Sequence, residues 1–211
     1  ALVEAYYDIK NESEKCVIVG GSDYKTNSGS MITLRQYGLI NNKEGDLVGK
    51  PFDINSKGFI RSDGSAYLIV EKEANNPYCE ILSIETISDS SSNLSYSKNS
   101  ELLESLITNT IEKAGIIKEN IGLIISSADG NYNSDKVELN ALKKIFIENL
   151  PELITPKEFT GNVFSASTYI HIALGAYILK NNLKTTDYIL ITGFGIGSEK
   201  YCCILGKIKE E

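Results

Sequence analysis

The sequence predicts an α/β protein in which helices alternate with buried strands. Two apolar runs, Cys16–Val19 and Tyr188–Thr192, are nearly continuous, which is typical of strands that are covered on both faces. Between them, residues 100–114 repeat apolar side chains with the period of an amphipathic helix. We find no linker and no break in composition that would divide the chain into independent domains.

The chain also contains an internal repeat, which predicts a duplicated architecture. Each copy reads as a helix, a short polar turn, a buried strand that ends in glycine and, after a connection, a second strand. The first copy covers residues 5–21 and 63–73, and the second covers residues 176–195 and 198–207. Only the first copy has a long insertion between its strands, over residues 22–63.

The remaining elements are predicted from periodicity and from stop signals. In chain order we expect a helix over 1–9, a strand over 78–87, a Ser-rich loop over 88–99, a helix over 100–114, a strand over 121–126, a helix over 134–150, a short strand over 153–155 and a helix over 164–179. Ser100 or Asn99 is the expected N-cap of the 100–114 helix, and Gly115 its C-cap. Pro151 is expected to stop the 134–150 helix.

Composition and charge exclude several classes of function. Hydrophobic residues make up 42% of the 211 residues, which is enough to bury a core. The net charge of −7 argues against nucleic-acid binding, which needs clustered Lys and Arg, and against direct docking of an acidic carrier protein. No apolar run approaches the roughly 18 residues of a membrane span, and no signal peptide opens the chain. We therefore expect a cytoplasmic protein that binds neither nucleic acid nor membrane.

The four cysteines do not have the spacing of a metal site. Cys202 and Cys203 are neighbours on a predicted strand, so their side chains point to opposite faces. Cys16 lies in another apolar strand. We interpret the cysteines as small buried hydrophobes in a reducing cytoplasm, with a disulfide framework as the alternative.

Six segments, taken in order, resemble motifs of the β-ketoacyl synthase family, which has the thiolase fold. They are CVIVGGSD (16–23), PFDINSKGFIRSDG (51–64), GIIKENIGLIISSADG (115–130), SDKVELNALKKIF (134–146), PKEFTGN (156–162) and GFGIGSEKYCCILG (193–206). The resemblance implies a thiolase-like fold with α/β/α/β/α layers, of which this chain is the C-terminal half with the last part of the N-terminal repeat. Residues 1–74 would end the N-terminal ketosynthase-like repeat, and residues 75–211 would form the C-terminal ketosynthase-like domain. Because the resemblance begins within a domain, we expect the natural start upstream of Ala1; removal of an initiator Met is the alternative.

The departures from these motifs concern the catalytic residues. In the family, a Cys nucleophile and two His carry out condensation with decarboxylation. The resemblance places the two His positions at Asp129 and Asn162, and the nucleophile shortly upstream of Ala1. A carboxylate cannot donate as an imidazole does, and Asn cannot shuttle a proton, so we expect no catalytic residue here. Lys157 and Glu138 match family residues that often form an ion pair, and we expect both to be structural.

The tripeptide Ala128-Asp129-Gly130 resembles the chain-length factors of type II polyketide synthases, which are non-catalytic relatives. This resemblance implies a subunit that forms a heterodimer with a ketosynthase catalytic subunit and helps to set chain length during condensation of malonyl units. No bound cofactor or metal is implied. The phosphopantetheine of an acyl carrier protein would carry the substrate, mainly on the partner, and the N-terminal half of the protein is expected as a separate chain.

Two other functions stay open. One is a divergent active β-ketoacyl-acyl carrier protein synthase, an acyltransferase, that uses Asp129 and Asn162 differently. The other is a structural or binding module on a thiolase-like scaffold. Asp129 could also be a general base paired with Glu138 or Asp135, although we favour a role for the last two in holding their helix.

Two further features have a functional and a structural interpretation. His171, the single histidine, lies on the 164–179 helix at a position where the family often carries an acidic residue. We interpret it as packed or solvated rather than catalytic. Residues 193–197 resemble a nucleotide-binding loop in their glycines, but a strand follows them instead of a helix, so we expect a loop that lines or floors a cavity.

Overall fold

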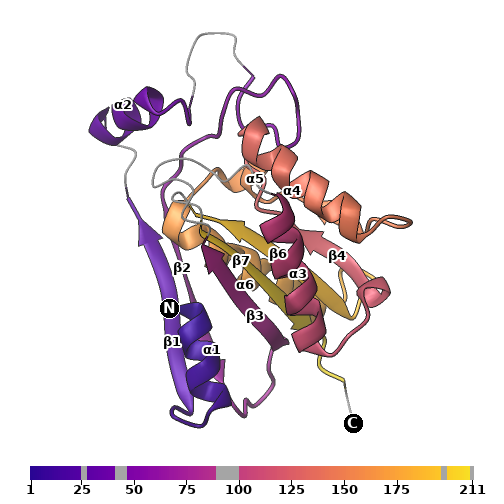
Figure 1. Ribbon diagram of the computed structural model, residues 1–211. Helices are drawn as coiled ribbons and strands as arrows, with labels where there is room; N and C mark the ends of the chain where they lie inside the picture. The colour runs from indigo at the N-terminus through magenta and orange to yellow at the C-terminus, as the bar shows by residue number, and fades with distance from the viewer. Residues whose placement is uncertain (25–27, 41–46, 89–99, 196–198, 210–211) are drawn as a thin grey trace.

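Two β-sheets and two layers of helices alternate in the computed structural model (Figure 1). The structure describes residues 1–24, 28–40, 47–88, 100–195 and 199–209. These layers follow the alternation of helices and strands predicted from the sequence. Among the described helices, none is both long and apolar enough to cross a membrane.

The smaller sheet consists of β1 (Cys16–Asp23) and β2 (Gly64–Glu71), which pair in antiparallel register. The larger sheet has the order β3-β7-β6-β4-β5, with bounds Glu80–Ser88, Glu199–Gly206, Tyr188–Phe194, Ile121–Ile125 and Glu152–Ile154. In this sheet β4 pairs in parallel with both β5 and β6, whereas β7 is antiparallel to β3 and β6. The parallel pair β4–β6 lies at the centre of the larger sheet, where strands are covered on both faces.

Two helices pack between the sheets, namely α1 (Leu2–Lys10) and α6 (Ser167–Lys180). Their apolar side chains join inward-facing residues of both sheets in one hydrophobic cluster. A glycine in α6 allows this close packing. A Cβ at Gly175 would lie only 2.9 Å from Leu205 Cδ1.

The other face of the larger sheet is covered by α3 (Ser100–Ala114) and α4 (Tyr132–Ile145). The predicted span of α3 is confirmed, and Gly115 follows it with a φ of +68°, as a glycine C-cap requires. The N-cap prediction falls partly on Asn99, which lies outside the described residues, as does the 89–99 part of the predicted loop. Residue 88 ends β3 instead of belonging to that loop.

Two predicted helices differ from the observed ones, and four short elements complete the fold. They are α2 (Ser28–Gln36), the 3-10 turns η1 (Lys118–Asn120) and η2 (Phe164–Ala166), and α5 (Lys157–Thr160). The predicted helix over 134–150 is wrong at its end, because α4 stops at Ile145. Phe146 leaves the helix there to enter the core, so Pro151 is not the stop signal. The predicted helix at 164 begins as a 3-10 turn, and α2 was not predicted.

The prediction that the two apolar runs are covered on both faces is correct for β6 and wrong for β1. The strand β6 contributes Ile189, Leu190 and Ile191, all fully buried. In contrast, Ile18 of β1 is 70% exposed, since the described residues place nothing over that face. The cysteines divide in the same way: Cys202 and Cys203 are buried on opposite faces as predicted, whereas Cys16 is exposed.

Candidate functional site

A buried polar site lies where β4 ends and the chain turns toward α4. The five residues after β4, Ser126–Gly130, are all buried. The α5 helix and the turn after it bring Lys157 and Asn162 to the same place, although they follow Ser127 by some thirty positions in the sequence. Polar groups at the carboxyl ends of parallel strands commonly form ligand sites in α/β sheets.

Asp129 and Asn162 are in direct contact. The resemblance places them at the two positions that histidine occupies in the family. Asn162 Nδ2 donates a hydrogen bond of 2.7 Å to Asp129 Oδ2, and both side chains are buried. The other carboxylate oxygen accepts from the amide of Asn131 at 3.0 Å. Asn162 Oδ1 accepts from the amide of Phe164 at 2.9 Å. Both side chains are therefore satisfied by protein groups, and the amide donor of Asn162 is directed at a carboxylate.

Arg61 fixes the backbone of Asn162 from the opposite side. Its guanidinium donates to the Asn162 carbonyl at 2.9 Å and forms a buried ion pair with Asp23 at 2.7 Å. The guanidinium carbon also lies 4.4 Å from the ring centroid of Phe164. Arg61 was not singled out in the sequence, because its role depends on an isolated bridge between Arg61 and Asn162 that no local pattern reveals.

Lys157 is 5% exposed and is bound by Ser127. Its Nζ donates to the Ser127 carbonyl at 2.8 Å and to the Ser127 hydroxyl at 3.2 Å. Asp129 Oδ2 lies 4.0 Å from the same nitrogen. The buried ammonium is thus close to a carboxylate and to two neutral acceptors, which is the environment that a buried charge requires.

Glu138 and Lys157 do not form the direct ion pair that the matching family residues often form. Instead Ser127 lies between them, because its amide donates to Glu138 Oε1 at 3.1 Å. The Thr192 hydroxyl donates to the same oxygen. Glu138 Oε2 has no partner among the described residues, and burial raises the pKa of this carboxyl.

Asp135 holds the turn that contains Asp129. One carboxylate oxygen accepts from the Asp129 amide at 3.1 Å, and the other accepts from the amides of Gly130 and Phe52, each at 3.0 Å. Burial, followed by the charge of Asp129, raises the pKa of Asp135 to about 7. These contacts support the interpretation in which Asp135 is structural, and they also anchor residue 52 of the Pro-Phe-Asp motif.

His171 is packed rather than solvated, being 1% exposed. Neither ring nitrogen has a hydrogen-bond partner among the described residues. Burial, together with the positive charge of Lys157, lowers the pKa of His171 to about 3, so the ring is neutral at physiological pH. Among the described residues, the His171 ring forms no hydrogen bond with Asp129 or Asn162.

Ser127 and Thr192 were missed in the sequence, although a signal for them was present. They lie at the carboxyl ends of the neighbouring parallel strands β4 and β6, where side chains converge. The loop over 193–197 begins at this site, since the Phe194 amide donates to Ser127 Oγ at 3.0 Å. Residues 196 and 197 lie outside the described part of the chain, so the prediction for this loop remains a prediction.

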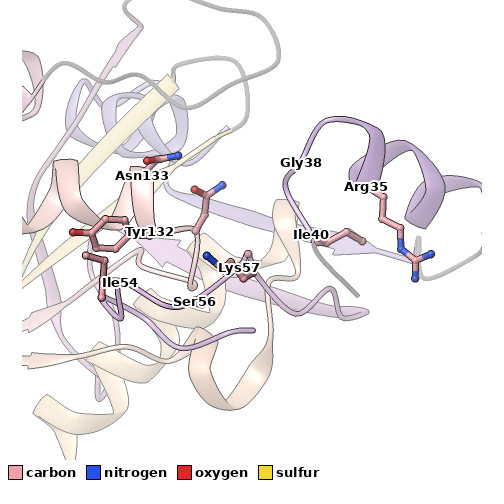
Figure 2. Close-up of a pocket in the computed structure, with 10 residues that line it drawn as sticks. Arg35, Gly38, Ile40, Ile54, Ser56, Lys57, Tyr132 and Asn133 are labelled. Atoms are coloured by element: carbon pink, nitrogen blue, oxygen red, sulfur yellow. The ribbon is translucent and has the colours of Figure 1, made fainter. Parts of the chain in front are cut away.

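A pocket of about 660 Å³ lies beside the buried site, on the other side of Gly130. Figure 2 shows its lining, which comes from α2 and the residues after it, the 54–58 loop and the start of α4: Arg35, Gly38, Ile40, Ile54, Ser56, Lys57, Gly58, Asn131, Tyr132 and Asn133. Gly130 has a φ of +97°, and a Cβ there would lie 2.8 Å from Ser56 Oγ and from the Lys50 amide. A glycine is therefore required where the site meets the pocket loop.

Family models match almost the whole chain in two consecutive pieces. Beta-ketoacyl synthase, N-terminal domain, matches residues 1–76, and Beta-ketoacyl synthase, C-terminal domain, matches residues 78–185. The 3-oxoacyl-[acyl-carrier-protein] synthase 2 of Mycobacterium tuberculosis (strain ATCC 25618 / H37Rv) is 23% identical over 192 residues, which are 87% of this chain and 46% of that protein. The chain spans about half the length of the curated relatives it matches.

Solved structures agree with the layered architecture. A ketosynthase in complex with its chain length factor from Xenorhabdus doucetiae superposes with a TM-score of 0.86 at 18% identity, covering 98% of this chain and 57% of that chain. A type II polyketide synthase acyl-carrier protein in complex with its ketosynthase bound to the hexaketide gives a TM-score of 0.88 at 16% identity, covering 99% and 60%. Identity this low shows the fold alone, and the thiolase-like fold predicted from the sequence is confirmed.

Proposed function

Since the chain belongs to the beta-ketoacyl synthase family, we propose that it is part of a non-catalytic, chain-length-factor-like subunit of a type II polyketide synthase. Its partner is a ketosynthase catalytic subunit, with which it forms a heterodimer. The condensation of malonyl units takes place on that partner. The substrates are carried on the phosphopantetheine of an acyl carrier protein, which contacts mainly the partner.

The hydrogen bond between Asn162 and Asp129 is the observation that carries this proposal. Decarboxylative condensation develops negative charge on a carbonyl oxygen and on the nucleophilic carbon, and donors must stabilise that charge. At the two positions in question one side chain is a carboxylate, which repels such charge. The other directs its amide donor at that carboxylate over 2.7 Å. The buried cation Lys157 donates to Ser127 and lies 4.0 Å from Asp129, and Arg61 donates to the backbone carbonyl of Asn162.

Two solved neighbours support the choice of partner. The names of these structures describe a ketosynthase with its chain length factor and a ketosynthase with its acyl-carrier protein. The net charge of −7 fits a subunit that leaves an acidic carrier protein to its partner, because like charges oppose docking.

A divergent active synthase is the second candidate, and a specific observation favours it. Lys157, Asp129 and Asn162 are buried together and hydrogen-bonded, as catalytic side chains commonly are. The curated relative from Mycobacterium tuberculosis is itself named a synthase. A structural or binding module on the same scaffold has no comparable observation in its favour.

The test measures condensation of radiolabelled malonyl-acyl carrier protein by the assembled protein, with and without an active ketosynthase from the same source. We expect no ketide product without the ketosynthase, and a product of defined length with it. Asp129→Asn should leave the turnover of the heterodimer unchanged, as should the exposed control Asp187→Asn. Both variants are first checked for folding by circular dichroism.

Product formation without the ketosynthase would refute the proposal. If Asp129→Asn then lowered that turnover by about 100-fold or more, the side chain would be a catalytic group of an active synthase. Failure of the protein to bind the ketosynthase, seen by native mass spectrometry, would favour the structural or binding module.

A further inference from the structure

One wall of the pocket of about 660 Å³ is a loop with a closed base. Residues 49–58 form this loop, and Figure 2 shows the side chains that it contributes to the lining, which are Ile54, Ser56 and Lys57. The base is closed because the Gly49 amide donates to the Gly58 carbonyl at 2.8 Å, and the Lys57 amide donates to the Leu47 carbonyl at 2.8 Å. We call residues 50–56 the loop tip. The tip can therefore change position while the base stays in place.

Asp135 is the main polar anchor of the loop tip. The Phe52 amide donates to Asp135 Oδ2 at 3.0 Å. Lys50 also forms an ion pair with Glu158 of α5 at 2.7 Å, but its side chain is 51% exposed, and surface pairs of this kind contribute little. Among the described residues, the backbone of the tip is thus fastened to the protein interior mainly by this buried carboxylate.

Phe52 is held in a strained backbone conformation. Its φ is +62°, in the left-handed region that a bulky side chain rarely adopts. Such strain persists only where surrounding contacts hold the residue in place. The hydrogen bond to Asp135 is a contact of this kind, and its loss would let Phe52 relax to an ordinary conformation.

The ionised form of Asp135 is the one that suits this arrangement. Its Oδ1 accepts from the Asp129 amide at 3.1 Å, and its Oδ2 accepts from the amides of Gly130 and Phe52, each at 3.0 Å. Protonation would weaken all three bonds, since charge-assisted hydrogen bonds are stronger than neutral ones, and a proton on Oδ2 would displace one amide. Asp129 and Gly130 lie in a buried turn, whereas Phe52 lies in a strained surface loop. The Phe52 contact is therefore the one that yields.

The charges around Asp135 favour its protonated form. Besides Asp135 itself, the turn after β4, the first half of α4, α5 and the loop carry the charged side chains Asp129, Lys136, Glu138, Lys157, Glu158, Lys50, Asp53 and Lys57. Burial, followed by the charge of Asp129, raises the pKa of Asp135 to about 7, and Glu138 acts in the same direction. The Phe52 hydrogen bond lowers the pKa of Asp135, so this bond and a proton on Asp135 oppose each other.

We propose that Asp135 is a pH-dependent latch on this pocket. Its ionised carboxylate holds the loop tip in place through the Phe52 amide. Protonation of the carboxylate lets the tip relax away from α4, which changes the shape of the pocket. The latch acts on the pocket beside the buried site, and it does not depend on the function proposed above.

Tryptophan fluorescence tests the latch, because the sequence contains no Trp. Ile54→Trp introduces a single tryptophan into the loop tip at a position that is 66% exposed. We expect its emission maximum to shift in one transition between about pH 8.5 and about pH 5.5, with a midpoint of about 7. Circular dichroism over the same range checks that the protein stays folded.

Variants in the same background identify the carboxylate. Asp135→Asn cannot ionise, so its emission should match that of the low-pH form at every pH. Asp129→Asn removes a like charge and should move the midpoint to lower pH. Asp53→Asn is the matched control, because Asp53 belongs to the loop tip and accepts from the Asn55 amide within it. This control should leave the transition unchanged.

Hydrogen exchange of the parent protein provides a test that needs no variant. After correction for the intrinsic effect of pH, amides of residues 50–56 should exchange about tenfold or more faster at about pH 5.5 than at about pH 8.5, whereas those of β6 should not. Constant emission or constant protection across this range would overturn the proposal. An unchanged transition in Asp135→Asn would also overturn it. Should that variant fail to fold, an unshifted midpoint in Asp129→Asn would have the same meaning.

Discussion

Asn162 donates to Asp129 over 2.7 Å, and this hydrogen bond connects two segments that are 33 residues apart in the sequence. It joins the turn after β4 to the turn after α5, so the site is held together at its centre by the two side chains that depart from the family pattern. Lys157 adds a positive charge 4.0 Å from Asp129. These contacts make the cluster a buried, hydrogen-bonded polar network, whatever its role in chemistry.

Asp129→Asn should destabilise the protein by about 3 kcal/mol, because it removes the carboxylate nearest to the buried Lys157 and leaves that ammonium without a charged partner. Urea unfolding at pH 7 measures the change in the free energy of unfolding. The exposed Asp187→Asn is the control and should be neutral. An Asp129→Asn variant as stable as the parent would show that Lys157 does not need this carboxylate.

Lys157→Met should also cost about 3 kcal/mol, because the carbonyl and hydroxyl of Ser127 lose their donor and Asp129 loses its nearest cation. The solvated Lys143→Met is the matched control on α4 and should have little effect.

A double-mutant cycle separates the pair from its surroundings. If Asp129 and Lys157 stabilise each other, the double variant should be about 1 to 2 kcal/mol more stable than the sum of the two single losses predicts. Strict additivity would mean that the 4.0 Å separation is too long for useful coupling, and that each residue is held by its own neutral partners.

The sequence predicts the layers well because periodicity reports burial, as in α3 and in the fully buried strand β6. It fails at β1, since the apolar run that includes Ile18 is as continuous as that of β6, yet no described residue covers the face that carries Ile18. An apolar run reports the composition of a strand, and it does not report whether another segment packs on each of its two faces. The end of α4 was also missed, because the turn at Phe146 depends on burial in the core rather than on a local stop signal.

Within the site, resemblance identified Asp129, Asn162, Lys157 and Glu138, and the structure brings all four together around Ser127. Ser127 itself was not predicted. A serine inside a buried turn has no sequence pattern of its own, and its importance comes from three groups used at once: the amide, the carbonyl and the hydroxyl. The separation of Lys157 and Glu138 also depends on Ser127, which lies between them, so it could not be inferred from spacing along the chain.

Gly130→Ala should destabilise the protein by about 3 kcal/mol, combining left-handed backbone strain with a clash. Its φ is +97°, and the added Cβ would lie 2.8 Å from the Lys50 amide. Gly115→Ala is the control for strain alone, because its φ is +68° and nothing lies within 4 Å of the added Cβ. That variant should cost about 1 kcal/mol. Thermal unfolding compares the two, and equal losses would mean that the 49–50 segment moves aside without cost.

His171→Met should make the protein less sensitive to acid. The pKa of His171 is lowered to about 3 in the folded chain from 6.5, so between these values the unfolded chain binds a proton that the folded chain does not. Stability contributed by the neutral ring is therefore present above pH 6.5 and is lost as the pH falls toward 3. Between pH 7 and pH 5 the parent protein should lose about 2 kcal/mol more stability than the variant.

Urea unfolding at pH 7 and pH 5 measures this difference directly. Asp135 and Glu138, whose pKa values are raised, act in the opposite direction, since they bind protons in the folded state and favour folding as the pH falls. They are present in both proteins, so the difference between parent and variant isolates His171. If the two proteins lose equal stability at pH 5, the ring must gain a partner on protonation, because nothing else would keep a buried imidazolium in place.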